Sequence, residues 1–144
     1  NFAKYIENDE STFEPMLECS MLAGKAINIA RTTAPHAFSY KLHKLKGFYH
    51  GRAVAVSLAY IWKFMEKSGK LDSLMKETRE ITGFDVDGYI NFLSKLGLCN
   101  DLTMTESQFD ETIHGVNTQR LQNFPLKLTA DDIENIYSSF IKVK

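Results

Sequence analysis

Three of the four histidines, His36, His43 and His50, fall within one stretch of fifteen residues. Neutral imidazole is a favoured ligand of zinc and iron, and a catalytic metal needs about three or four protein ligands with one position left open. Two histidines alone do not complete such a site. His43 is flanked by lysines, so we expect it to face solvent. His36 and His50 are each either a metal ligand or an ordinary capping or core histidine.

The glycines offer no phosphate-binding loop. All eight stand singly, and no pair has the spacing of a G-x-G-x-x-G or Walker-type motif. A nucleotide site would therefore need residues from outside this chain.

Two apolar runs flank the histidines and predict buried helices. Residues 16–30 are apolar over more than half of a helical circumference, which predicts a central helix that begins at a capping box formed by Ser11–Glu14. Residues 53–67 predict a second buried helix. Between them, Pro35 suits the first turn of a new helix, which places His36 near a helix N-terminus.

The rest of the chain has the pattern of shorter amphipathic helices and no convincing strand. Two capping sequences, at Thr105–Gln108 and Thr129–Asp132, mark helix starts. The predicted helices cover residues 71–82, 86–96, 109–116 and 133–141. The fold class is therefore all-α, a helical bundle of about seven or eight helices within a single domain over residues 1–144.

Composition describes an ordinary soluble globular domain. The 144 residues are 44% hydrophobic and 24% charged, with a net charge of -1, which argues against disorder and against a nucleic-acid partner. No run approaches the ~20 apolar residues of a membrane span, and the first ten residues have no signal-peptide core. Cys19 and Cys99 match neither a metal-binding pair nor a disulfide scaffold, which favours a cytoplasmic location.

The sequence around the histidines resembles the signature of the iron-containing alcohol dehydrogenase family. Residues 34–42 and 47–55 are similar to the family's H-A-L-A-Y-P-L-G segment and to the P-H-G that follows it, whose leading histidines are fourteen residues apart. His36 and His50 have this spacing. Two further similar segments lie at residues 22–29 and 117–125, so the resemblance covers nearly the whole chain.

The resemblance implies that residues 1–144 are most of the helical C-terminal domain of a two-domain, NAD(P)-dependent dehydrogenase. In the family, an N-terminal α/β domain binds NAD(P), and the helical domain holds a divalent metal, Fe2+ or Zn2+. His36 and His50 match two of the metal ligands. The other two belong to a D-x-x-x-H motif that is absent before Ser11. We therefore expect the isolated chain to be inactive, to bind metal weakly, and to need its N-terminal domain as partner.

The resemblance also suggests the substrate class, a small aldehyde or alcohol. The sequence of residues 32–36, together with Asn117 and Arg120, is more similar to the phosphonoacetaldehyde reductase branch of the family than to simple alkanol dehydrogenases. Arg120 could bind phosphonate oxygens bidentately, and a salt bridge is its alternative role. Lys25 and Arg52 are weaker anchors of the same kind.

Tyr40 lies where many relatives place a second His or Tyr, close to the metal histidine. The resemblance gives it a catalytic part, as a proton relay or as a wall of the substrate site. Its alternative is a partly buried aromatic whose hydroxyl is hydrogen-bonded.

The chain also departs from the family pattern. Tyr49 precedes His50 where relatives have Pro, and residues 43–46 replace a glycine-containing turn. A related lyase, dehydroquinate synthase, is the alternative enzyme, although its G-H-T-x-G-H signature has a histidine where this chain has Thr32. A non-catalytic assembly or binding domain is the alternative outside enzymes. An exposed interdomain face would also permit homo-oligomers.

Overall fold

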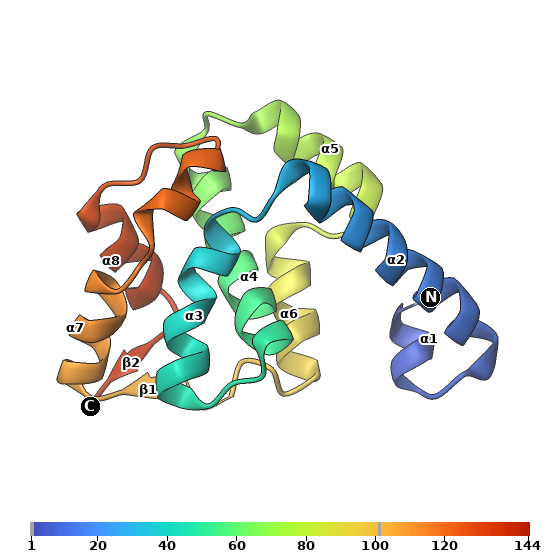
Figure 1. Ribbon diagram of the computed structural model, residues 1–144, viewed down its shortest axis with the longest axis horizontal. Coiled ribbons are helices and arrows are strands. Elements are labelled where there is room, and N and C mark those ends of the chain that lie inside the picture. Colours follow the sequence, from blue (N-terminus) through green and yellow to red (C-terminus); the bar gives the residue numbers. More distant parts are fainter. Residues whose placement is uncertain (1, 101) are drawn as a thin grey trace. The chain divides into compact units, whose positions relative to one another are not determined.

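The computed structural model describes residues 2–100 and 102–144, which divide into two compact units, the first ending at Thr32 and the second running from Thr33 to Lys144. Unit 1 contains α1 (Phe2–Ile6), a 3-10 helix η1 (Glu10–Thr12) and α2 (Phe13–Ala30). Unit 2 contains α3 (Ala34–Lys46), α4 (His50–Ser68), α5 (Asp72–Thr82), α6 (Val86–Lys95), β1 (Thr103–Met104), α7 (Glu106–His114), the 3-10 helix η2 (Thr118–Asn123), α8 (Ala130–Ser138) and β2 (Lys142–Val143) (Figure 1). The prediction of an all-α fold is confirmed.

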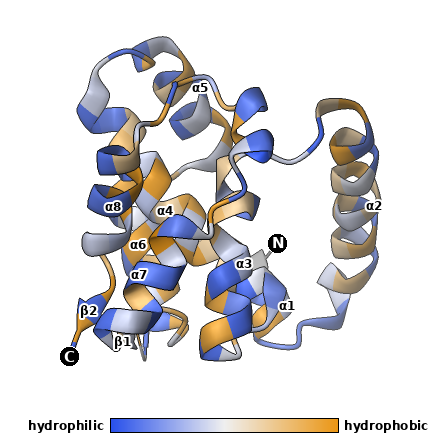
Figure 2. Ribbon diagram, turned by 60° about the vertical axis from the view of Figure 1, so that its left-hand side comes forward, coloured by the Kyte–Doolittle hydropathy of each residue, from blue (hydrophilic) through white to orange (hydrophobic). Residues whose placement is uncertain are grey.

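Helix α4 lies at the centre of unit 2. It contacts α3, α5, α6 and α8, and its buried residues include Ala53, Val56, Ile61 and Trp62. In Figure 2 the hydrophobic residues of this unit concentrate on α4 and its neighbours. The predicted second buried helix is therefore confirmed. In the described part of the chain, no helix is both long and apolar enough to cross a membrane.

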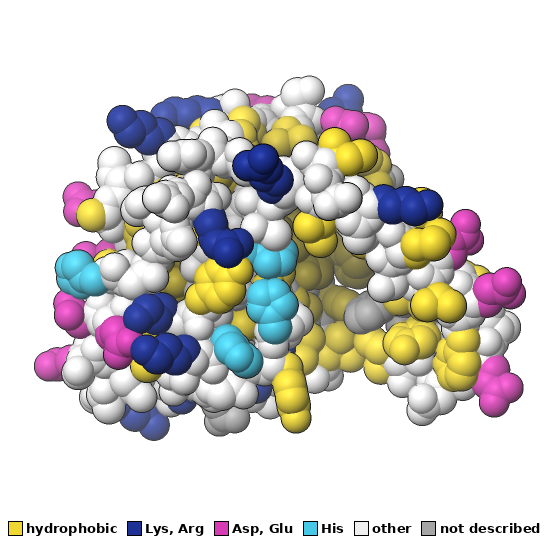
Figure 3. Space-filling view, viewed as in Figure 1, with side chains coloured by type: hydrophobic (Ala, Val, Ile, Leu, Met, Phe, Trp, Pro, Cys, Tyr) yellow, Lys and Arg dark blue, Asp and Glu magenta, His cyan; other side chains and the backbone are white. Residues whose placement is uncertain are grey.

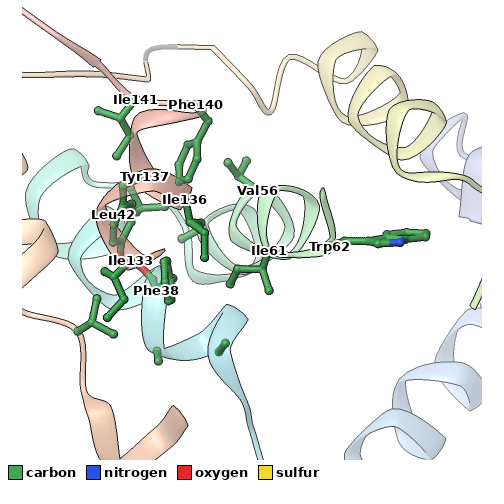
Figure 4. Close-up of a cluster of buried hydrophobic side chains, with 14 of the residues drawn as sticks. Phe38, Leu42, Val56, Ile61, Trp62, Ile133, Ile136, Tyr137, Phe140 and Ile141 are labelled. Atoms are coloured by element: carbon green, nitrogen blue, oxygen red, sulfur yellow. Dashed lines mark hydrogen bonds between the residues drawn. The ribbon is translucent and has the colours of Figure 1, made fainter. Parts of the chain in front are cut away.

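A ring stack joins α3 to α8 within this core. Phe38 and Tyr137 are fully buried, and their ring centroids are 4.7 Å apart. The Tyr137 hydroxyl donates a hydrogen bond of 2.8 Å to the Phe38 carbonyl. Figure 4 shows both rings among the apolar side chains that fill the space between these helices and α4. This packing holds α3 in place.

Local sequence sets most helix ends. Thr105 with Gln108 and Thr129 with Asp132 form the two expected capping boxes, at the starts of α7 and α8. The prediction of a capping box at Ser11–Glu14 is wrong. Asp9 instead caps η1 by accepting a hydrogen bond from the Ser11 backbone N–H at 3.0 Å, because an aspartate two residues earlier offers a stronger acceptor to that turn.

The described residues of unit 2 also contain one short parallel strand pair, where the sequence predicted none. Thr103 pairs with Lys142 and Met104 with Val143. Helix α8 accordingly ends at Ser138, before the predicted boundary at Ile141. Two residues are too few to produce a recognisable alternating pattern, and the pairing depends on contacts distant in sequence.

Helix α2 does not have the burial that its sequence predicted. It contains no buried residue, and Leu17, Met21 and Ile29 are exposed. Within unit 1 this helix has no core around it, and the central helix of unit 2 is α4. A wide apolar stripe predicts that a helix can be buried, but it does not identify the surface that buries it.

Candidate metal site

Helix α3 presents His36 and Tyr40 on the same face, since they are four residues apart. Pro35 occupies the first turn, where its missing N–H costs nothing. The Thr33 carbonyl accepts a hydrogen bond from the His36 backbone N–H at 3.1 Å. The buried Ser39 hydroxyl donates to the His36 carbonyl at 2.9 Å. These bonds fix the turn from which the His36 side chain projects.

A tight connection brings His50 to the start of α4. Gly47 ends α3 with a φ of 66°, and its N–H donates to the His43 carbonyl at 3.0 Å. Phe48 is 4% exposed and anchors the connection in the core, whereas Tyr49 is 87% exposed. His50 is then the first residue of α4, with its side chain at the surface.

The two predicted histidine ligands lie side by side. The ring centroids of His36 and His50 are 5.4 Å apart, with an interplanar angle of 54°. Two imidazoles that bind one ion tetrahedrally, with metal–nitrogen bonds of about 2.0–2.1 Å, have their centroids about 5 Å apart. The observed pair has this separation. In Figure 3 histidine side chains gather on the face shown.

The pKa of His36 lies below its usual range. Partial burial contributes most, and the positive charges of His50 and Arg120 add to the effect. All three causes disfavour the imidazolium. His36 is therefore neutral at pH 7, the form in which a histidine binds metal.

Tyr40 and Arg120 adjoin the histidine pair. The Tyr40 ring centroid is 6.3 Å from that of His50, and the Arg120 guanidinium carbon lies 4.9 Å from the centre of the Tyr40 ring. Arg120 belongs to η2, which packs against α3. Both side chains are exposed. The structure therefore brings four of the five predicted site residues together on one open surface.

Asn117, the fifth predicted residue, has a local structural role. It is the N-cap of η2, and its side-chain oxygen accepts a hydrogen bond from the Gln119 backbone N–H at 3.0 Å. It thereby fixes the 3-10 helix that carries Arg120. The side-chain amide protons of Asn117 are not used in this cap.

Arg52 is not available as an anion anchor. Its guanidinium donates to the carbonyls of Leu98 and Asn100 and lies 3.7 Å from the centre of the Phe48 ring. These contacts tie the start of α4 to the segment after α6. Arg52 was the weaker candidate for substrate binding, with a solvated charge as the favoured alternative, and these contacts give its guanidinium a structural role instead. Lys25 lies in unit 1, on α2.

Residues that position the site were not singled out from the sequence. Phe48 and Ser39 carry no chemistry of their own, and they act through burial and a backbone hydrogen bond. The pattern at residues 47–48, a glycine followed by an aromatic, was the available indication of an anchored turn. His43 is exposed, as expected.

The described residues do not form a complete metal site. Among the residues that the structure describes, no three His, Cys, Asp or Glu side chains come together in a group that could hold a metal ion. His36 and His50 fit one ion by their spacing and their chemistry, but two imidazoles fall short of the three or four protein ligands that such sites use. The arrangement therefore needs further ligands.

Comparison with protein families gives one match. The family model described as "Fe-containing alcohol dehydrogenase family, C-terminal" matches residues 1–141. No curated protein and no solved structure matches the chain. The matched range includes every residue of the candidate site.

Proposed function

We propose, because the chain belongs to the iron-containing alcohol dehydrogenase family and forms its C-terminal domain, that the intact protein interconverts a small aldehyde and its alcohol with NAD(P). The observation that carries this proposal is the pairing of His36 with His50, 5.4 Å apart by ring centroid. NAD(P) would be bound mainly by an N-terminal domain outside this chain, because no phosphate-binding glycine motif is present here.

His36 and His50 would hold the metal, Fe2+ or Zn2+, with further ligands from outside this chain. Such an ion, when bound, supplies Lewis-acid stabilisation of negative charge on the carbonyl oxygen. The two histidines contribute neutral nitrogen donors, and the lowered pKa of His36, caused first by burial, keeps that donor unprotonated at neutral pH.

Tyr40 would handle the proton in this scheme. Hydride transfer to an aldehyde leaves an alkoxide that must gain a proton, and the reverse reaction must remove one. The Tyr40 ring lies beside His50, and its hydroxyl can both donate and accept. We assign it the proton relay between the substrate oxygen and solvent.

Arg120 would select the substrate. Its guanidinium lies over Tyr40 and within electrostatic range of His36, so it faces the same surface as the histidine pair. A phosphonate or other oxyanion on the substrate could accept two parallel hydrogen bonds from it. This supports a small phosphonylated aldehyde as the substrate, with Asn117 orienting η2 and offering its amide protons.

The test uses the intact protein, reconstituted anaerobically with Fe(II) or Zn(II). NAD(P)H oxidation is followed with phosphonoacetaldehyde and with unphosphonylated aldehydes, and bound metal is measured by mass spectrometry. We expect metal-dependent turnover, and we expect His50→Ala to lose both metal and turnover. His114→Ala is the matched control, since His114 is an exposed histidine on α7 whose contacts are with Asp110, and it should keep both.

Two outcomes would contradict the proposal. If the folded, metal-loaded protein oxidises no cofactor with any aldehyde, the lyase or a non-catalytic role takes its place. If His50→Ala and His114→Ala reduce metal content equally, His50 is not a ligand.

A further inference from the structure

Side chains of the C-terminal half of α4 and of helix α8 line a groove in unit 2. The two helices contact one another. The groove consists of two adjoining hollows of about 180 and 530 Å³ that share Phe64, Lys67 and Asn135. None of its lining residues is acidic. The proposed dehydrogenase chemistry makes no use of this surface.

Three lysines line the groove. Lys63 and Lys67 are four residues apart on α4, and Lys70 follows the end of that helix. Like charges at this helical spacing repel one another. Lys63 pairs with Asp87 at 3.3 Å, an exposed contact, and Lys70 lies within electrostatic range of Asp132.

Of the three lysines that line the groove, Lys67 is the one with no acidic partner among the described residues. Among the described residues, its ammonium group forms no ion pair, although it borders both hollows. An anion placed in the groove would face Lys67 directly and would relieve its repulsion with Lys63. The positive charge of Lys67 would therefore attract an anionic ligand into the groove.

The floor of the groove is apolar. Tyr60 stacks on Phe140 with ring centroids 4.6 Å apart, and Ile136 is 2% exposed. Figure 4 shows Ile136 of α8, and Phe140 just after the end of that helix, on the side that faces α4. Phe64 is half-buried and borders both hollows. A ligand that fits this floor has an aromatic or aliphatic body beside its charged group.

This groove is remote from the candidate metal site. His50 and Lys67 lie near opposite ends of α4, and at about 1.5 Å per residue they are about 25 Å apart along the helix axis. A small molecule bound in the groove is therefore too far from the histidine pair to contact it.

We propose that the groove between α4 and α8 binds a small organic phosphate monoester, with its phosphate at Lys67, which Lys63 and Lys70 flank, and its apolar body on Phe64. A phosphate monoester carries a charge of about -1.5 to -2 at pH 7, so it is attracted to a group of lysines more strongly than a carboxylate with its single charge. The Asn135 side chain, which also borders both hollows, can donate to a phosphate oxygen.

Isothermal titration calorimetry of the intact protein with phenyl phosphate tests the proposal. Phenyl phosphate combines a dianion with an aromatic ring and lacks the nucleoside that a cofactor site would recognise. We expect saturable binding, and weaker binding of inorganic phosphate, which has no apolar body. Lys67→Glu should weaken phenyl phosphate binding about tenfold or more, since it replaces attraction by repulsion.

Matched variants make the test specific. Lys95→Glu makes the same charge change near the other end of α4, where Leu98 contacts Arg52, and it should alter affinity less than about twofold. Arg120→Ala removes the anion anchor proposed for the substrate site, so it separates any phenyl phosphate bound there from the binding that depends on Lys67. Circular dichroism shows whether Lys67→Glu folds. If it does not, Lys67→Gln replaces it, and we expect that variant to lose less affinity for phenyl phosphate.

The proposal is overturned if phenyl phosphate does not bind saturably, or if Lys67→Glu and Lys95→Glu weaken it equally. It is also overturned if inorganic phosphate binds as tightly as phenyl phosphate. A loss confined to Arg120→Ala would move the anion to the substrate site, which would support the proposed function and refute this inference.

Discussion

The Arg120 guanidinium lies over the Tyr40 ring, with its carbon 4.9 Å from the ring centre. This contact joins η2 to α3 and brings a permanent cation toward His36. A cation on an aromatic face is attracted by the ring quadrupole and holds both groups in one arrangement. Arg120 therefore affects the histidine pair before any substrate binds.

The first prediction concerns the pKa of His36 in the metal-free protein. We expect it below the ordinary value of 6.5, because partial burial and the charges of His50 and Arg120 disfavour the imidazolium. Arg120→Gln should raise this pKa, whereas Arg79→Gln, on α5, should leave it unchanged. Nuclear magnetic resonance titration of the imidazole protons measures each value, and an unchanged pKa in Arg120→Gln would contradict the electrostatic link.

The same shift gives the folded state a pH dependence of known sign. A histidine whose pKa is lower in the folded state binds its proton more readily when unfolded. The contribution of His36 to stability is therefore complete above pH 6.5 and falls as the pH drops through the folded pKa. Urea unfolding at several pH values measures this effect. Below pH 6.5, the free energy of unfolding should fall less in His36→Gln than in the unchanged protein.

The second prediction concerns Arg120 and substrate choice. If the substrate carries an oxyanion, Arg120→Ala should lower kcat/KM for a phosphonylated aldehyde by about tenfold or more, because a bidentate charged hydrogen bond is lost. The value for an unphosphonylated aldehyde should change less. Steady-state kinetics on both substrates checks this, and equal losses on both would show that Arg120 only supports the site.

Features encoded locally in the sequence were predicted better than contacts between distant segments. The spacing of His36 and His50 led to two rings that lie together, because the helix start at Pro35 and the turn at Gly47 are both encoded locally. The contact of Arg120 with Tyr40 had no local sign, since it depends on how η2 packs against α3.

The errors have the same origin. Arg52 was a weak candidate for the site because it follows His50 closely in sequence, and a solvated charge was favoured, yet its guanidinium binds the carbonyls of Leu98 and Asn100 after α6. The strand pair between residues 103–104 and 142–143 likewise joins segments that no local pattern connects. Capping boxes, by contrast, involve residues only three positions apart, and both of those in unit 2 were predicted correctly.

The third prediction concerns the hydrogen bond within the core of unit 2. Tyr137→Phe keeps the ring stack on Phe38 but removes the donor to the Phe38 carbonyl, a buried bond of 2.8 Å. We expect a loss of about 1 kcal/mol in the free energy of unfolding. Urea denaturation should show a lower midpoint with an unchanged slope. Tyr49→Phe is the control, because Tyr49 is 87% exposed, and a loss of equal size there would refute the assignment.

The fourth prediction concerns the turn that presents His50. Gly47 has a φ of 66°, a conformation that costs a residue with a side chain about 1–2 kcal/mol, so Gly47→Ala should destabilise the protein by about that amount. No atom lies within 4 Å of the position of an added Cβ, so the expected loss comes from the backbone alone. Gly24→Ala is the matched control, because Gly24 lies inside α2 with equally open surroundings, and there alanine should stabilise by about 0.5–1 kcal/mol. Thermal unfolding followed by circular dichroism compares the two variants. Opposite signs support the left-handed turn, whereas stabilisation by both would mean that the chain reaches His50 by a different path.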